Sequence, residues 1–261
     1  MSQRLFAIIS VVCVAVFFAS HPVSAQRPRS VSDAQIIEEA TLVASGERVE
    51  LFQRGVHVDP AFLRLAEHAY RRLEALAGRT FDTATLGPKI RMYASGAVTT
   101  SHVWRGYGHP RDPRSIVVLN PRVYGRALRD TNATYVHAMA HLLTWHYQSR
   151  TLREGLADYW ALQAHPGAGV GPNVDGYAWS PSIPTDVVAY LGTTRPPPPW
   201  LVSDAPRRRA DCFASYRLVK WLIDRGGLSV FMKLYEADNP EVELPKLYGA
   251  SREELVRMAG M

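Results

Sequence analysis

The chain has 261 residues, of which 47% are hydrophobic, and a formal net charge of +6 at pH 7. This weak positive charge comes without aromatic residues interleaved among the arginines, which argues against a nucleic-acid-binding protein. Of the two cysteines, Cys13 lies in the apolar N-terminal stretch, so Cys212 has no partner for an internal disulfide.

Residues 1–25 have the pattern of a secretory signal peptide. Arg4 precedes an apolar stretch over 5–19, and Val23-Ser24-Ala25 gives a small-x-small motif before Gln26. The stretch is shorter than the roughly 20 residues that a membrane-spanning helix needs. We therefore expect a secreted or periplasmic protein with no membrane span after cleavage, the alternative being a retained anchor.

The rest of the chain predicts a single domain over 46–261, preceded by a flexible segment over 26–45. Residues 165–209 are rich in proline and glycine, including Pro196 to Pro199, and predict a long loop. We expect no regular element in that loop except a short helix around 186–191.

The predicted elements describe an α+β fold, with a small mixed β-sheet and a flanking helix followed by a helical half. The first half has a weakly strand-like run over 47–58, a helix from Asp59-Pro60 to Gly78, strands over 89–95 and 115–119, and a loop over 96–114. The second half has helices over 130–148, 151–163, 211–225, 229–237 and 251–258, with Gly226-Gly227 separating two of them.

A pair of histidines marks the candidate chemistry. His137 and His141 are four residues apart in the predicted helix over 130–148, so both imidazoles project from one face and can reach one ion. Such a pair by itself is a weak signal, because it also arises by chance.

Two acidic residues in the next predicted helix strengthen the signal. Glu154 follows His141 after a short break, so the chain can fold back and complete a set of two nitrogens and one oxygen. Asp158, one turn further along, can accept the remaining N–H of a ligating histidine. The sequence thus predicts a metal site with a fourth position open.

The sequence from His137 to His141, followed by Glu154-Gly155-Leu156-Ala157, resembles the gluzincin zinc metallopeptidases, especially the peptidase MA-like group. The family motif is His-Glu-x-x-His, a gap, then Glu-Gly-Leu-Ala. The resemblance is specific over 137–159 and diffuse over the rest of 45–258. It implies that His137, His141 and Glu154 bind Zn²⁺, with Asp158 behind them, and that the substrate or partner is a polypeptide.

One position departs from that motif. Ala138 stands where the family has the glutamate that takes a proton from water at the zinc and passes it to the leaving amine. Because general acid–base assistance is worth about 10²–10⁴-fold, its loss should cripple peptide hydrolysis without emptying the metal site. No residue of the chain is therefore assigned as catalytic.

Four histidines outside the motif are candidates for a replacement base: His102, His109, His146 and His165. We expect His146 to face away from the pair, because it lies about 140° around the helix from His141. His102 and His109 lie in the predicted loop over 96–114, and each is more simply a loop histidine.

Three functional readings follow. The first is an exported zinc-binding peptidase homologue with lost or strongly reduced activity that binds a polypeptide or cell-envelope partner. The second is an active zinc hydrolase with a relocated base. The third is a metal-free binding or structural protein on the same fold. The sequence favours the first, because a metal-free scaffold has no chemical reason to keep His137, His141, Glu154 and Asp158.

Overall fold

The computed structural model describes residues 31–105, 115–120, 133–144, 148–164, 183–198 and 204–261. In this part of the chain, five strands form one mixed sheet in the order β1-β2-β3-β5-β4. The three central strands are parallel and both edge strands are antiparallel to their neighbours. The strands are β1 (Thr41–Ser45), β2 (Val49–Arg54), β3 (Ile90–Ser95), β4 (His102–Arg105) and β5 (Ser115–Leu119).

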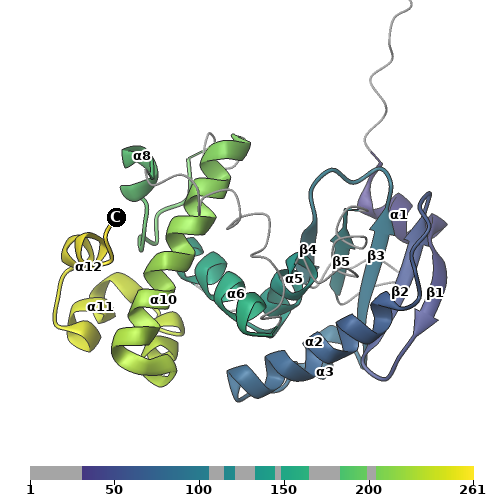
Figure 1. Cartoon of the computed structure of the whole chain (residues 1–261), viewed down its shortest axis with the longest axis horizontal. Coiled ribbons are helices and arrows are strands. Elements are labelled where there is room, and N and C mark those ends of the chain that lie inside the picture. The colour runs from purple at the N-terminus through teal and green to yellow at the C-terminus, as the bar shows by residue number, and fades with distance from the viewer. Residues whose placement is uncertain (1–30, 106–114, 121–132, 145–147, 165–182, 199–203) are drawn as a thin grey trace, which may run out of the picture. The chain divides into compact units, whose positions relative to one another are not determined.

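Alternating side chains of the sheet enter two separate cores, as the period of two in a strand requires. Met92 and Val117 lie in the large core that the helices share, whereas Tyr93 and Val118 lie on the opposite face. Helix α1 (Asp33–Glu39) covers that second face with two buried isoleucines. The sheet therefore has a helix-rich face and a face closed by one short helix (Figure 1).

Helix α2 (Phe62–Ala77) packs against the sheet and against the helices of the second half. Before it, the Asp59 carboxylate accepts a hydrogen bond from the Ala61 backbone N–H, and after it Gly78 adopts the left-handed conformation (φ 62°). Glycine terminates helices in this way because it has no Cβ to clash. The predicted end at Gly78 is confirmed, whereas the helix begins at Phe62, with Ala61 and not Asp59 in the N-cap position.

The second half of the chain is helical, as predicted, and the α+β class is confirmed. The remaining helices of the described residues are α3 (Thr83–Leu86), α5 (Thr134–Leu143), α6 (Arg150–Ala164), α8 (Thr185–Val188), α10 (Ala205–Tyr235), α11 (Pro240–Tyr248) and α12 (Arg252–Met258). Helix α6 contacts both α5 and α10 (Figure 1). Its Trp160 is fully buried. Gly227, with φ 79°, breaks α10 where the sequence predicts a separation between two helices.

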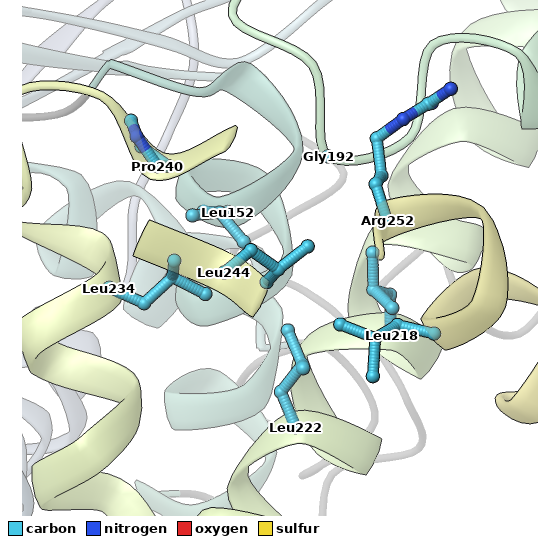
Figure 2. A pocket seen from close by; sticks show the side chains of 9 residues that line it. Leu152, Gly192, Leu218, Leu222, Leu234, Pro240, Leu244 and Arg252 are labelled. Carbon is cyan, nitrogen blue, oxygen red and sulfur yellow. The ribbon is translucent and has the colours of Figure 1, made fainter. Parts of the chain in front are cut away.

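The helices of the C-terminal part enclose a small apolar cavity, shown in Figure 2. Leucines of α6, α10, α11 and α12 line most of it, and the stem of Arg252 forms part of one wall. No histidine or carboxylate lines this cavity. It is thus a packing gap of the core, separate from the predicted metal ligands.

Three expectations about secondary structure are corrected. Within the segment expected to be flexible, 26–45, the structure has α1 and β1; Ser32 caps α1, and β1 is too exposed to show an alternating pattern. Within the loop expected over 96–114, β4 pairs with β5, and 106–114 lie outside the described residues. Helix α11 lies between the predicted helices over 229–237 and 251–258, where no element was predicted, and it forms with Pro245 inside it.

The proline-rich segment 165–209 also contains helical residues. Helix α8 confirms the short helix expected near 186–191, although it ends earlier. Helix α10 begins at Ala205, before the predicted Asp211, because Asp204 caps it and Pro206 fits its first turn. Residues 165–182 and 199–203 lie outside the described part of the chain.

Candidate metal centre

The two histidines and the two acidic residues come from facing helices. His137 and His141 lie one turn apart on α5, and Glu154 and Asp158 lie one turn apart on α6, which packs against α5. The two imidazole rings are nearly perpendicular, with centroids 4.5 Å apart. All four side chains therefore meet at the α5–α6 interface.

Three potential ligand atoms converge on one point. The Nε2 atoms of His137 and His141 are 2.9 Å apart, and Glu154 Oε2 lies 3.4 Å from the first and 3.5 Å from the second. Ligand atoms of a tetrahedral zinc ion, with bonds of about 2.0–2.1 Å, lie about 3.3 Å from one another. The observed triangle fits that spacing, and two nitrogens with one carboxylate oxygen are a donor set that zinc accepts.

Asp158 holds one of the histidines from behind. His137 Nδ1 donates to Asp158 Oδ1 over 2.6 Å, which leaves Nε2 of the same ring directed at His141 and Glu154. A carboxylate in this position fixes the ring orientation and raises the basicity of a metal-binding imidazole. The role expected for Asp158 matches this contact.

The centre is buried and its charges are tightly coupled. Burial lowers the pKa of His137, but Asp158 and Glu154 outweigh this and raise that pKa to about 10. Burial lowers the pKa of His141. The neighbouring Glu154 carboxylate raises this pKa, but burial together with the charge of His137 outweighs it. The raised pKa of His137 favours a protonated ring when no metal is bound, and a metal ion that binds Nε2 must displace that proton.

The carboxyl of Glu154 is held ionised. Burial by itself raises the pKa of Glu154, but His141, Arg153 and His137 lie beside it and hold the pKa well below its ordinary range. An ionised carboxylate is the form that binds a metal. The residues present therefore fit a zinc ion in geometry, and the carboxylate is already in the form that binds it.

Gly155 allows α10 to approach α6 directly beside the carboxylate ligand. A Cβ atom at this position would lie 2.3 Å from the Ser215 carbonyl oxygen and 2.5 Å from Val219 Cγ2. No other residue type fits without moving one helix. Sequence reasoning did not assign Gly155 a role; a glycine in the middle of an otherwise regular helix was the available signal.

Two further residues near the centre, Ala138 and Cys212, offer no group that could accept or donate a proton in catalysis. Ala138 is buried in the large core and offers only a methyl group next to His137. The Cys212 thiol is buried too, and burial together with the nearby Glu154 and Asp158 carboxylates raises its pKa well above the ordinary value. Cys212 is therefore a protonated core residue.

The structure excludes one candidate for a relocated base. His102 pairs with Val118, so its side chain lies on the face of the sheet covered by α1, opposite the face that shares a core with α5 and α6. There its Nε2 contacts Asp33 at 3.0 Å. The other three candidates, His109, His146 and His165, lie outside the described residues.

None of the helices in the described part of the chain is long and apolar enough to cross a membrane.

No protein-family model matches the sequence, and no curated protein matches it either. Among solved structures, the chain is similar to native yeast LTA4 hydrolase, with a TM-score of 0.49 and 11% sequence identity. The match covers 84% of this chain but 38% of that one, so this chain spans well under half of its length. At this identity and TM-score, the similarity assigns neither a family nor an activity.

Proposed function

We propose that this chain is an exported zinc-binding homologue of the gluzincin metallopeptidases in which peptide hydrolysis is lost or strongly reduced. One observation carries the proposal: His137 Nε2, His141 Nε2 and Glu154 Oε2 converge at zinc-ligand spacing, while the residue after His137 is alanine. The intact ligand set supports metal binding, and the alanine supports the loss of turnover.

The chain keeps the zinc ligands that peptide hydrolysis needs but lacks the group that carries the proton. Zinc held by His137, His141 and Glu154 would supply a Lewis acid that polarises a carbonyl oxygen. Asp158 would keep His137 in the ligating orientation. No group at position 138 can accept a proton from the attacking water or deliver one to the leaving amine. Hydrolysis should therefore be slower by about 10²–10⁴-fold than with a glutamate there.

A site that keeps its ligands without the proton carrier suits binding better than turnover. We expect the occupant to be a polypeptide or a cell-envelope partner that contacts the metal centre. The resemblance of residues 137–159 to peptidases that act on polypeptides supports this, as does the signal-peptide pattern of residues 1–25. The exclusion of His102 as a replacement base also weakens the alternative of an active hydrolase.

The test restores the missing group. Zinc content and peptide hydrolysis should be measured for the mature protein, for Ala138→Glu, and for Ala138→Gln as a control of similar size without the proton-carrying group. We expect about one zinc in all three and a 10²–10⁴-fold gain in rate for the glutamate variant alone. The zinc content of Ala138→Gln shows whether the buried position tolerates a longer side chain.

Two outcomes would contradict the proposal. A wild-type protein that takes up no zinc would leave only the metal-free reading. A wild-type protein that hydrolyses peptides as fast as Ala138→Glu would show that another group carries the proton, and the chain would be an active hydrolase.

A further inference from the structure

The carboxylate of Glu154 is divided between two partners. Its Oε2 atom faces the Nε2 atoms of His137 and His141, as described above. Its Oε1 atom accepts two hydrogen bonds from the preceding residue, Arg153, one from Nε at 3.0 Å and one from Nη2 at 2.5 Å. Each oxygen of the ligand thus has a separate role.

This contact is not a consequence of helix geometry. Consecutive residues of an α-helix do not face each other, so the Arg153 side chain must fold back along α6 to reach its neighbour. Ordering a long side chain costs conformational entropy, which the ion pair must offset. The side chains of Arg153 and Glu154 are 22% and 10% exposed, so the pair lies largely out of solvent, where its attraction is screened less than at the surface.

The division has a consequence for how a metal binds. A free carboxylate can bind a metal ion through one oxygen or through both. With Oε1 held by the guanidinium group, only Oε2 remains directed at the metal position. Two histidine nitrogens and one carboxylate oxygen then leave one tetrahedral position open.

We propose that Arg153 is a positioning residue, which makes Glu154 bind the metal through Oε2 alone and keeps the fourth position open. This inference rests on the proposed zinc site. The competing explanation is that Arg153 only forms an ion pair that stabilises α6. Such a pair would affect folding without changing how the metal is bound.

The chain contains a matched control for this distinction. Arg252 also precedes a glutamate on a helix and binds its Oε1 atom through Nε at 3.0 Å and Nη2 at 2.6 Å. Its side chain is 23% exposed, close to the value for Arg153, but Glu253 is 70% exposed and belongs to no metal-ligand group of the described residues. Arg252 also donates to backbone carbonyls, so its removal should cost stability.

The experiment compares Arg153→Met, Arg153→Lys and Arg252→Met with the wild type in the full mature protein. The readouts are the zinc affinity by chelator competition, the visible absorption spectrum of the Co²⁺-loaded protein, and the melting temperature. We expect Arg153→Met to weaken zinc binding by about 10–100-fold, as for other groups that orient a metal ligand. Its Co²⁺ bands should weaken too, because a second carboxylate oxygen raises the coordination number above four.

Arg153→Lys should recover part of the affinity, since lysine keeps the charge but lacks the two-pronged donor. Arg252→Met should lower the melting temperature and leave zinc affinity and Co²⁺ spectrum unchanged. Zinc affinity and Co²⁺ spectrum of Arg153→Met equal to those of the wild type would overturn the role of Arg153 and leave the zinc site standing. A wild type that binds no metal would overturn both.

Discussion

The described part of the chain contains two histidine–aspartate pairs, which differ in the ring nitrogen that the aspartate contacts. At the α5–α6 interface, Asp158 binds Nδ1 of His137, and Nε2 is directed at two further potential ligands. At the β4 edge of the sheet, Asp33 binds Nε2 of His102, and the Nδ1 atom contacts the Thr100 carbonyl. The second histidine has no nitrogen left for a metal.

Burial separates the two pairs as well. Asp158 is nearly inaccessible, whereas the Asp33 pair lies beside Trp104, which is half exposed and donates its Nε1–H to the same carboxylate. A buried pair with a second histidine and a carboxylate beside it has the ligand set for a metal ion. A part-exposed pair in which both histidine nitrogens already have partners instead connects α1 to the sheet.

The largest expected difference is the effect of metal removal. A metal ion that binds only the folded protein, at a free concentration of 1,000 Kd, stabilises it by about 4 kcal/mol. For a domain of this size that corresponds to a fall of about 8–16 °C in melting temperature when a chelator is added. Calorimetry with and without chelator measures this shift. An equal shift in His141→Ala, which lacks a ligand, would mean that the chelator acts elsewhere.

The next effect concerns the helix contact that supports the buried pair. Gly155→Ala places a Cβ against the Ser215 carbonyl oxygen, so α6 and α10 must separate beside Glu154. We expect a loss of about 1–3 kcal/mol in unfolding free energy, together with weaker zinc binding. Gly78→Ala is the matched control: it strains a left-handed position that has open space around it, so it should cost stability without changing zinc affinity. If Gly155→Ala binds zinc as tightly as Gly78→Ala, the helix contact at Gly155 has no role in zinc binding.

A smaller effect separates the two aspartates. Asp158→Asn removes the charge behind His137 and should weaken zinc binding by about 10–100-fold. Asp33→Asn makes the same change at the other pair and should leave zinc binding unaltered. Chelator competition on both variants measures the difference. The distinction between the two pairs fails if the two substitutions weaken zinc binding alike.

The smallest effect is on the sheet edge itself. Asp33→Ala removes the acceptor shared by His102 and Trp104, two part-exposed hydrogen bonds that tie α1 to β4. Such bonds contribute about 0.5–1.5 kcal/mol each. Because both bonds are at least partly exposed, we expect a loss at the lower end of their sum, about 1–2 kcal/mol in the free energy of unfolding by denaturant, with the zinc content intact. A loss of zinc from this variant would connect the two pairs and contradict their independence.

The arrangement of the candidate metal centre was predictable because its signal is local. The spacing of His137 and His141, and of Glu154 and Asp158, places each pair on one face of a helix whatever the rest of the fold does. The contact between α5 and α6 then follows from the short connection between them. The structure brings together all four residues that the sequence selected.

The parts that sequence reasoning missed depend on long-range contacts. Strand β4 forms because it pairs with β5 from a segment whose composition indicates a loop, and that pairing alone turns His102 away from the metal centre. The roles of Gly155 and Arg153 depend on Ser215 and on the orientation of a side chain. Neither the contact with Ser215 nor the side-chain orientation can be predicted from the spacing of residues in the sequence.

The most direct test of the central claim is the zinc content of the purified mature protein, measured by elemental analysis beside His137→Ala and His102→Ala. The account predicts about one zinc per chain in the wild type and in His102→Ala, and none in His137→Ala. Absence of zinc from all three samples after metal is supplied, or retention of zinc in His137→Ala, would contradict it.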